Sequence, residues 1–311
     1  MNGTMKAIVV SCCAGYVMAL NALLNSLDYY GNTIDVHLLW WGDISLEKEP
    51  RVVKFLSELK NKPFGFNVTI VDLRTLFNPS RPYLEPYDRI WCLTFSRWLY
   101  SSDLGKLGYT AVLNTGADCM VLDNIMPWFD LVENTDVVVS GHNALGNVNF
   151  KSDKYVHTNE VPYADTPCFL DPRKHIDTLY NIYKIGYDYG CADMPAYYYA
   201  LRDAKAKVVL VPDNLWIRNY YYLDHLHKGM VDNKEYFWSS GTMMKISMVH
   251  GKYFNREHLD HLLYLWKLEN DKKPIEAKKE HMIYVDRSTN NLNVMHDFFK
   301  KMCFEYKLRL T

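Results

Sequence analysis

LNTGADCMVLD, residues 113–123, is the segment from which the architecture of this chain can be worked out. It has the pattern of an apolar strand that ends in an acidic turn, after which the apolar character resumes. Gly and Asp supply the backbone angles and local hydrogen bonds of turns, so Asp118 taken by itself is most simply a turn residue. A carboxylate at the C-terminal tip of a buried strand is also where a divalent cation can bridge protein and phosphate oxygens. The surrounding segments decide between these two interpretations.

Segments typical of buried strands alternate along the chain with amphipathic helices. Strands are expected at 6–11, 35–41, 66–71, 109–114, 136–140, 166–170 and 207–211, and helices at 17–27, 50–60, 88–104, 172–185 and 192–204. This alternation predicts an α/β fold class with a mainly parallel sheet covered by helices on both faces. Ligands of such sheets bind at the carboxyl ends of the strands, which is where the acidic turn lies. The polar segment 141–163 lacks periodicity, and we expect it to be a functional loop.

The composition is that of an ordinary folded protein, with 49% hydrophobic and 23% charged residues. A net charge of -1 gives no global field that would attract nucleic acid or an anionic membrane. The seven Cys residues follow no zinc-binding spacing, which favours reduced thiols in a cytoplasmic protein. No apolar run approaches the roughly 20 residues of a membrane helix, and the first residues lack the pattern of a secretion signal. We therefore expect a cytoplasmic protein with no membrane span.

The last part of the chain has a different character. Residues 255–268 have a helical pattern, 269–280 are highly charged, and 291–308 form a basic amphipathic pattern. We expect residues 1–255 to form one catalytic domain and residues 256–311 to form a helical extension packed on it.

The order of elements over residues 6–255, together with the acidic turn, resembles the glycosyltransferases of the GT-A fold, particularly the lineage of glycogenin and bacterial galactosyltransferases. The resemblance implies a single Rossmann-like GT-A domain with a mainly parallel, mixed sheet and a C-terminal helical cap. Members carry an Asp-x-Asp motif that contacts a divalent ion and the ribose of a nucleotide sugar. Here the motif is Gly116-Ala117-Asp118, so the first acid is absent. The resemblance makes Asp118 the metal ligand and places Gly116 and Ala117 at the donor, while Thr115 or the backbone fills the vacant position.

A second match is MVHGK at residues 248–252, which looks like the C-terminal His motif of these transferases. The resemblance implies that His250 is a metal ligand and that Lys252 meets the diphosphate. Imidazole and carboxylate together suit Mn²⁺, whereas ligation by oxygen alone favours Mg²⁺. A His on a strand is about as often a structural residue, so this alternative stays open.

Four further residues are candidates for contact with the donor or with the acidic motif. Ser11 and Tyr16 belong to the loop after the first strand, where backbone N–H groups face polar ligands and an aromatic ring can stack on a base. Asp43 follows the second strand and could accept the imide N–H of uracil or thymine, although a turn role is at least as frequent. Arg97 occupies a helical position where the family commonly has an Arg that pairs with the nucleotide or the acidic motif. Because it lies between Phe95 and Trp98, it is expected to be partly buried and to need a partner.

Asp193 opens a late helix and matches an acidic residue of the family. In inverting enzymes such a carboxylate acts as general base on the acceptor hydroxyl, and in retaining enzymes it orients the acceptor or stabilises an oxocarbenium-like transition state. It could equally be a helix N-cap, and the two roles are compatible. Polar residues near strand ends are weaker candidates for the acceptor site: His142, Asn143, Asp165, Thr166 and Asp171.

These residues together predict a metal-dependent hexosyl- or pentosyltransferase. The donor would be a nucleoside diphosphate sugar, and a UDP-sugar is the preferred candidate. The acceptor would be a hydroxyl group of a glycan, a protein or a modified DNA base. A DNA acceptor requires a basic, aromatic groove. The tail could contribute four basic residues to such a groove: Lys300, Lys301, Lys307 and Arg309. One alternative is a non-catalytic nucleotide-sugar-binding protein, because the first acid is missing. Another is a nucleotidyltransferase, but the loop Cys12–Gly15 lacks the basic residue that this activity needs.

Overall fold

The structure is a computed structural model in which a central seven-stranded sheet organises the chain. It describes residues 4–42, 50–61, 63–82, 88–145, 160–211, 216–217, 226–239, 245–250 and 297–307. In spatial order the strands are β3 (Val68–Asp72), β2 (Val36–Trp41), β1 (Lys6–Cys13), β4 (Ala111–Gly116), β7 (Glu160–Leu170), β6 (Val137–Leu145) and β8 (Val208–Val211). Only β7 runs against its neighbours, so the sheet is mixed and mainly parallel, as predicted.

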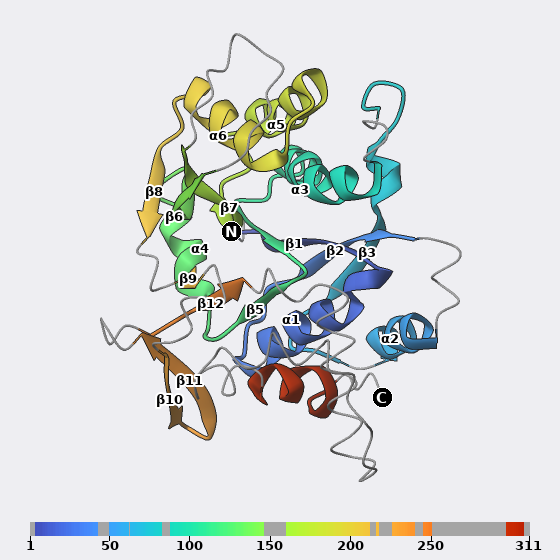
Figure 1. Ribbon diagram of the computed structural model, residues 1–311, viewed down its shortest axis with the longest axis vertical. Helices are drawn as coiled ribbons and strands as arrows, with labels where there is room; N and C mark the ends of the chain where they lie inside the picture. Colours follow the sequence, from blue (N-terminus) through green and yellow to red (C-terminus); the bar gives the residue numbers. More distant parts are fainter. Residues whose placement is uncertain are drawn as a thin grey trace, which may run out of the picture.

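Helices cover both faces of this sheet, which is why its central strands are almost continuously apolar. Figure 1 shows α3, α5 and α6 on one face, with α1, α2 and the C-terminal helical segment on the other. The helices are α1 (Val17–Tyr29), α2 (Pro50–Asn61), α3 (Asp88–Lys106), α4 (Met126–Val132), α5 (Ile176–Tyr189) and α6 (Asp193–Asp203), with short 3-10 helices η1 (Ala14–Tyr16) and η2 (Leu73–Leu76). Among the helices of the described residues, none is long and apolar enough to cross a membrane.

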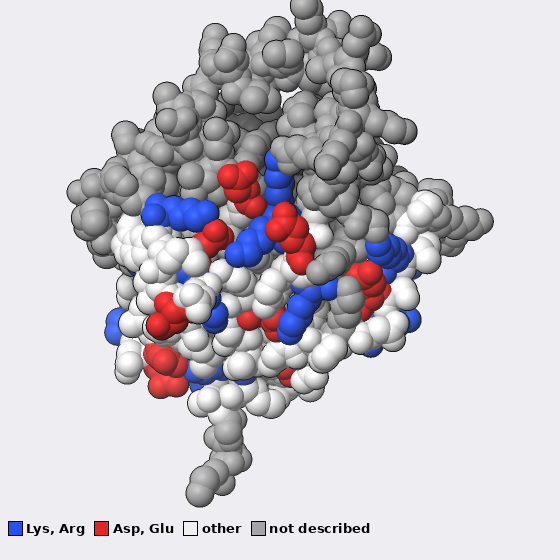
Figure 2. All heavy atoms as spheres, turned by 90° about the horizontal axis from the view of Figure 1, so that it is seen from below, with Lys and Arg blue, Asp and Glu red and all other residues white. Residues whose placement is uncertain are grey.

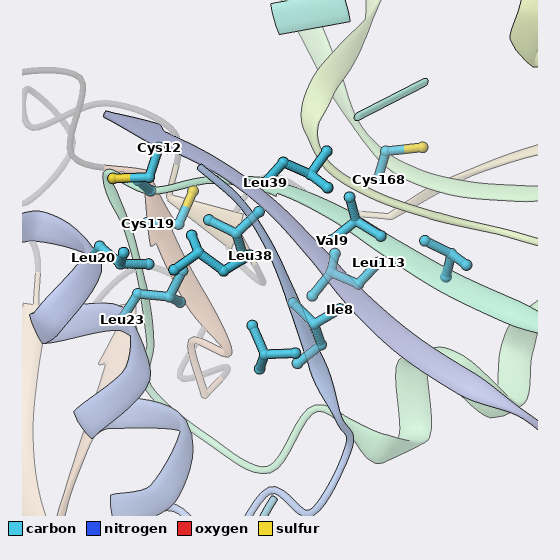
Figure 3. Close-up of a cluster of buried hydrophobic side chains, with 14 of the residues drawn as sticks. Ile8, Val9, Cys12, Leu20, Leu23, Leu38, Leu39, Leu113, Cys119 and Cys168 are labelled. Atoms are coloured by element: carbon cyan, nitrogen blue, oxygen red, sulfur yellow. The ribbon is translucent and has the colours of Figure 1, made fainter. Parts of the chain in front are cut away.

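The core lies between the sheet and these helices. In Figure 3, Leu20 and Leu23 of α1 point toward Leu38 of β2, while Ile8 and Leu113 come from the two central strands. All five side chains are fully buried. Burying an aliphatic side chain of this size contributes about 1.5–3 kcal/mol, so this contact holds α1 against the sheet.

Two smaller sheets lie beside the main one. β5 (Cys119–Val121), β12 (Met248–His250) and β9 (Trp216–Ile217) form a three-stranded sheet, and β10 (Leu226–Val231) pairs with β11 (Lys234–Ser239) in a hairpin. β12 runs antiparallel to β5, and its last residue, His250, pairs with Cys119. This pairing carries the late His motif to the acidic turn.

The segment 141–163 differs from the expected loop. β6 continues to Leu145 and β7 begins at Glu160, and the two strands pair beyond the edge of the central sheet. The pairing shifts register between Val139 and Gly141, and again between Gly141 and Ala144. Such bulges break the alternation of apolar and polar residues, so the strand signal disappears from the sequence. The centre of the segment, residues 146–159, lies outside the described residues.

The C-terminal segment packs on α1. Residues 297–300 are α-helical and continue into a π-helical turn at Lys301–Glu305. Asn21 and Asn25, both fully buried on α1, donate hydrogen bonds to the backbone oxygens of Cys303 (2.8 Å) and Met302 (2.5 Å). The side-chain amides of these two residues thus donate to backbone carbonyls that the change of helix type leaves without a partner within the helix. The expected helix 255–268 and the boundary at residue 255 fall outside the described residues, so that division of the chain stays a prediction.

Candidate functional site

The acidic turn and the late His lie together at the carboxyl edge of the sheet. β4 ends at Gly116, the chain turns through Ala117 and Asp118, and β5 pairs with β12. The Oδ1 atom of Asp118 is 3.3 Å from the Nε2 atom of His250. The Nδ1 atom of His250 is buried and has no hydrogen-bond partner within the described part of the chain. Among the described residues, only Asp118 holds the imidazole through a polar contact.

The electrostatic surroundings keep Asp118 ionised. Burial disfavours the charged carboxylate, but His250 and, more weakly, the guanidinium of Arg97 outweigh this effect, so the pKa of Asp118 is below its ordinary value. An ionised carboxylate beside an imidazole is a donor pair that binds a divalent cation.

Gly116 occupies the position of the missing first acid, and the packing explains why a side chain is absent there. A Cβ atom at this residue would lie 2.4 Å from Oδ1 of Asp118 and 3.7 Å from Cγ2 of Thr166. Any larger residue would therefore require the Asp118 carboxylate to shift. Gly116 also pairs with Ser11 of β1, so the first loop and the acidic turn share one edge of the sheet.

Cys119 is a third possible ligand that the sequence interpretation did not single out. One oxygen of Asp118, the Sγ atom of Cys119 and one nitrogen of His250 all lie within 4.8 Å of one another. Burial raises the pKa of the Cys119 thiol above its ordinary value, and the charge of Asp118 adds to this. Its position directly after the acidic motif was the available signal. These donors suit a divalent ion.

Arg97 lies behind the turn in a buried polar cluster. Its Nη2 atom is 3.0 Å from Oδ2 of Asp193, and its Nη1 donates to Oγ1 of Thr166 at 2.6 Å. The indole Nε1 of Trp98 also donates to Asp193, at 3.4 Å. The arginine is 4% exposed and the aspartate 6%. The expected burial of Arg97 and its need for a partner are thus met by Asp193 and Thr166.

Asp193 is the first residue of α6, and the N-cap is Ala192, so the prediction of an N-cap role is wrong by one residue. Its carboxylate, placed in the first turn, still interacts favourably with the helix dipole. Because the carboxylate is buried and paired with Arg97, the geometry favours a positioning role for Asp193 over proton transfer.

Of the remaining residues predicted to contact the donor, the structure describes three and leaves two outside the described residues. Ser11 lies on β1, and Tyr16 ends the short helix η1 with 37% of its surface exposed. Ala117 is buried in the turn itself. Asp43 and Lys252 lie outside the described residues.

The acceptor candidates divide into three groups. His142 and Asn143 are on β6 and Asp165 is on β7, in the paired extension beside the acidic turn, where the structure describes only the backbone. Thr166 is 3% exposed and accepts its hydrogen bond from Arg97, so it supports the buried cluster. Asp171 was placed wrongly. Because β7 is antiparallel to β4, with Leu170 opposite Val112, Asp171 lies at the other edge of the sheet.

Two of the tail lysines that a DNA acceptor would require in a basic groove are paired with acids. Lys301 is 3.5 Å from Glu235, and Lys307 is 2.8 Å from Asp28, so both pair with acids of this chain. Figure 2 shows acidic and basic side chains interspersed on one face of the molecule. Arg309 lies outside the described residues.

Three solved glycosyltransferase structures have a similar arrangement. The bifunctional glycosyltransferase WbbM is similar in structure: 89% of this chain aligns with 52% of WbbM, at 13% identity and a TM-score of 0.55, so the chain spans about half of that protein. Mouse xyloside xylosyltransferase 1 aligns over 98% of its length with 80% of this chain, at 10% identity and a TM-score of 0.51. The galactosyltransferase LgtC, solved with donor and acceptor sugar analogues, aligns over 98% of its length with 88% of this chain, at 13% identity and a TM-score of 0.50.

This chain has a GT-A fold. The fold expected from the resemblance is therefore confirmed. No protein-family model matches the sequence, and no curated protein sequence matches it. In this GT-A chain the acidic turn follows β4, and β12 brings His250 to it.

Proposed function

We propose that this GT-A chain is a metal-dependent glycosyltransferase that moves a sugar from a nucleoside diphosphate sugar to a hydroxyl acceptor. The observation that carries the proposal is the 3.3 Å contact between Asp118 and His250 at the carboxyl edge of the sheet. The two residues come from distant parts of the sequence, and the edge is where α/β sheets bind ligands.

Asp118 and His250 would hold the cation. When bound, a divalent ion neutralises the negative charge that grows on the departing diphosphate. Asp118 is already ionised in the folded protein because its pKa is lowered by His250 against the effect of burial. Arg97 binds Asp193 and Thr166, and thereby fixes the start of α6 and the strand β7 beside the turn.

The donor would lie along the ends of β1 and β4. Ser11 and Gly116 are paired neighbours there, and the exposed ring of Tyr16 offers a face for the base. Lys252 follows His250 by two residues and is proposed to meet the diphosphate, and Asp43 to contact the base. A UDP-sugar with Mn²⁺ is the preferred combination, since imidazole with carboxylate suits Mn²⁺. The acceptor would approach from the β6–β7 extension that carries His142, Asn143 and Asp165.

We also propose a cytoplasmic location, because all seven cysteines are free thiols.

A donor screen tests this proposal. UDP- and GDP-sugars are added with and without Mn²⁺ while thermal unfolding and release of nucleoside diphosphate are measured. A ligand present at about 100 times its Kd stabilises the native state by about 2.7 kcal/mol. We expect stabilisation by one donor class only when Mn²⁺ is present, together with slow release of the diphosphate into water. Stabilisation that is indifferent to metal would contradict the proposal.

A second candidate function is binding of a nucleotide sugar without catalysis. Two observations favour it: Gly116 replaces the first acid of the motif, and the Asp193 carboxylate is held in an ion pair with Arg97. The same screen separates the two functions. A binder shows Mn²⁺-dependent stabilisation with no diphosphate released, whereas a transferase turns over its donor.

A further inference from the structure

The metal-ligating groups at the acidic turn include a thiol. Cys119 opens β5 and pairs with His250 of β12, so the backbone register fixes the two residues side by side. Oδ1 of Asp118 and Nε2 of His250 are 3.3 Å apart, and one donor atom from each of Asp118, Cys119 and His250 lies within 4.8 Å of the others. Within the described residues this is the one such group of three.

These separations suit a single ion. Ligands at about 2.0–2.3 Å from a tetrahedral metal lie roughly 3.3–3.8 Å from one another. The carboxylate and the imidazole already have this spacing. The thiol lies within 4.8 Å of both other donor atoms, so it needs to approach them by at most about 1 Å to reach this spacing.

A carboxylate at the first position of the motif is not available to complete the site. A side chain at residue 116 would meet Oδ1 of Asp118 at 2.4 Å. The nearby Asp193 is held by Arg97 and Trp98. The site therefore has two oxygen or nitrogen donors from Asp118 and His250, and the next donor in reach is Cys119.

We propose that Cys119 is the third protein ligand of this site, in place of the missing acid, and that it makes the site selective for Zn²⁺ or Co²⁺ over Mg²⁺. Thiolate ligands favour the softer ions, whereas Mg²⁺ prefers oxygen donors. Binding replaces the S–H bond with a sulfur–metal bond, and the proton goes to solvent. One carboxylate and one thiolate balance the charge of a divalent ion. The inference rests on the proposed function only in what the bound ion would do, and not in which residues bind it.

Cobalt spectroscopy of the full chain tests the ligand assignment directly. The protein is stripped of metal with a chelator, Co²⁺ is titrated, and the near-ultraviolet charge-transfer band of a cobalt–thiolate bond is recorded. We expect the wild type to show the band at one equivalent and Cys119→Ser to lose it. Cys12→Ser is the matched control, because Cys12 is an equally buried thiol near the end of β1. Figure 3 shows it at the same end of the core as Cys119. This variant should keep the band.

The wild-type spectrum decides the question even where a variant fails to fold. Absence of the thiolate band at saturating Co²⁺, absence of Co²⁺ binding, or a band that survives in a folded Cys119→Ser protein would each overturn the proposal. Competition between Zn²⁺ and Mg²⁺ gives a second measurement. Loss of a ligand should lower the preference for Zn²⁺ by about tenfold or more.

The outcome is separable from that of the proposed function. A cobalt–thiolate band in a protein that turns over no nucleotide sugar supports Cys119 as a ligand and rejects the transferase. Metal-dependent transfer without the band supports the transferase and rejects Cys119.

Discussion

Arg97 and Asp193 are buried charges, and each depends on the other. Their side chains are 3.0 Å apart and only 5% and 9% exposed. Removing one partner of such a pair leaves an uncompensated charge in the interior, which costs far more than the pair itself contributes. Since Arg97 also binds Thr166 and lowers the pKa of Asp118, the pair connects the stability of the protein to the acidic turn.

Arg97→Met should therefore lower the free energy of unfolding by about 3–5 kcal/mol, because Asp193 is left without its cation. Urea unfolding measures this value. The double variant Arg97→Met with Asp193→Asn should recover part of the loss, because the unpaired charge is removed. A loss below about 1 kcal/mol in the single variant, the range of an exposed ion pair, would show that the pair is not buried in solution.

A second residue predicts a dependence on pH. Burial lowers the pKa of His37 below its ordinary value, against a weaker opposing effect of Asp35. The imidazole is held by the hydroxyl of Tyr100 at 2.8 Å. Below about pH 6.5 the unfolded chain takes up a proton that the folded chain does not, so stability falls as the pH falls through this range. Urea midpoints at pH 7.5 and 5.5 should therefore differ more for the wild type than for His37→Gln. Equal differences would exclude a buried neutral His37.

At the scale of elements, α3 and α5 approach so closely that glycine is needed between them. A Cβ atom at Gly186 would lie 2.2 Å from the ring of Phe95. That ring is fully buried and stacks on Trp91 with ring centroids 4.4 Å apart, so it has no room to move. The contact sets the position of α3, the helix that carries Arg97 to the site.

Gly186→Ala should destabilise the protein by about 1–3 kcal/mol through overpacking of this contact. Gly65→Ala is the control, because its Cβ would meet its nearest neighbour at 3.7 Å, an ordinary contact. Thermal unfolding of the two variants measures the difference. A Gly186→Ala protein as stable as the control would contradict the close approach of the helices.

At the scale of the whole molecule, the C-terminal segment shares the core of the sheet domain. Phe298 is 1% exposed, and its ring centroid lies 5.8 Å from that of Tyr29 on α1 and 5.3 Å from that of Phe237 on β11. Segments from both ends of the chain and from the hairpin therefore bury one another. Such a segment should unfold together with the domain and not before it.

Phe298→Ala should lower the free energy of unfolding by about 3–5 kcal/mol and leave a single cooperative transition. Leu107→Ala, at a side chain 68% exposed, should change little. Differential scanning calorimetry provides the measurement. A separate transition at low temperature, with the main transition unmoved, would show that the extension is an independent unit.

The fold was largely predictable because its central strands are buried on both faces and its helices are amphipathic. The apolar residues Ala7–Val10 of β1 and Ala111–Leu113 of β4 supply the buried side chains that such a sheet requires. The extension of β6 and β7 was not predictable, because its bulged register removes the two-residue period. The β10–β11 hairpin was also missed. Its turn at Asp232 and Asn233 has positive φ at both residues, which Asp and Asn tolerate, but no Gly marks the turn.

The site was predictable in part. The resemblance to a family related Asp118 to His250, and the apolar neighbours of Arg97 indicated a buried partner. The identity of that partner depends on how α3 and α6 pack, which no local pattern encodes. Cys119 was missed because its relation to His250 arises from the pairing of β5 with β12.

The most direct measurement is the rate of nucleoside diphosphate release from the donor sugar by Asp118→Ala, with Mn²⁺ present. The wild type should turn over its donor only with the metal, and the variant should lose about 10²–10³-fold in rate, the usual effect of removing one preorganised electrostatic group. Asp130→Asn, at an exposed aspartate paired with Lys6, should retain the wild-type rate. Metal-dependent turnover by Asp118→Ala at the wild-type rate would contradict the assignment of this site.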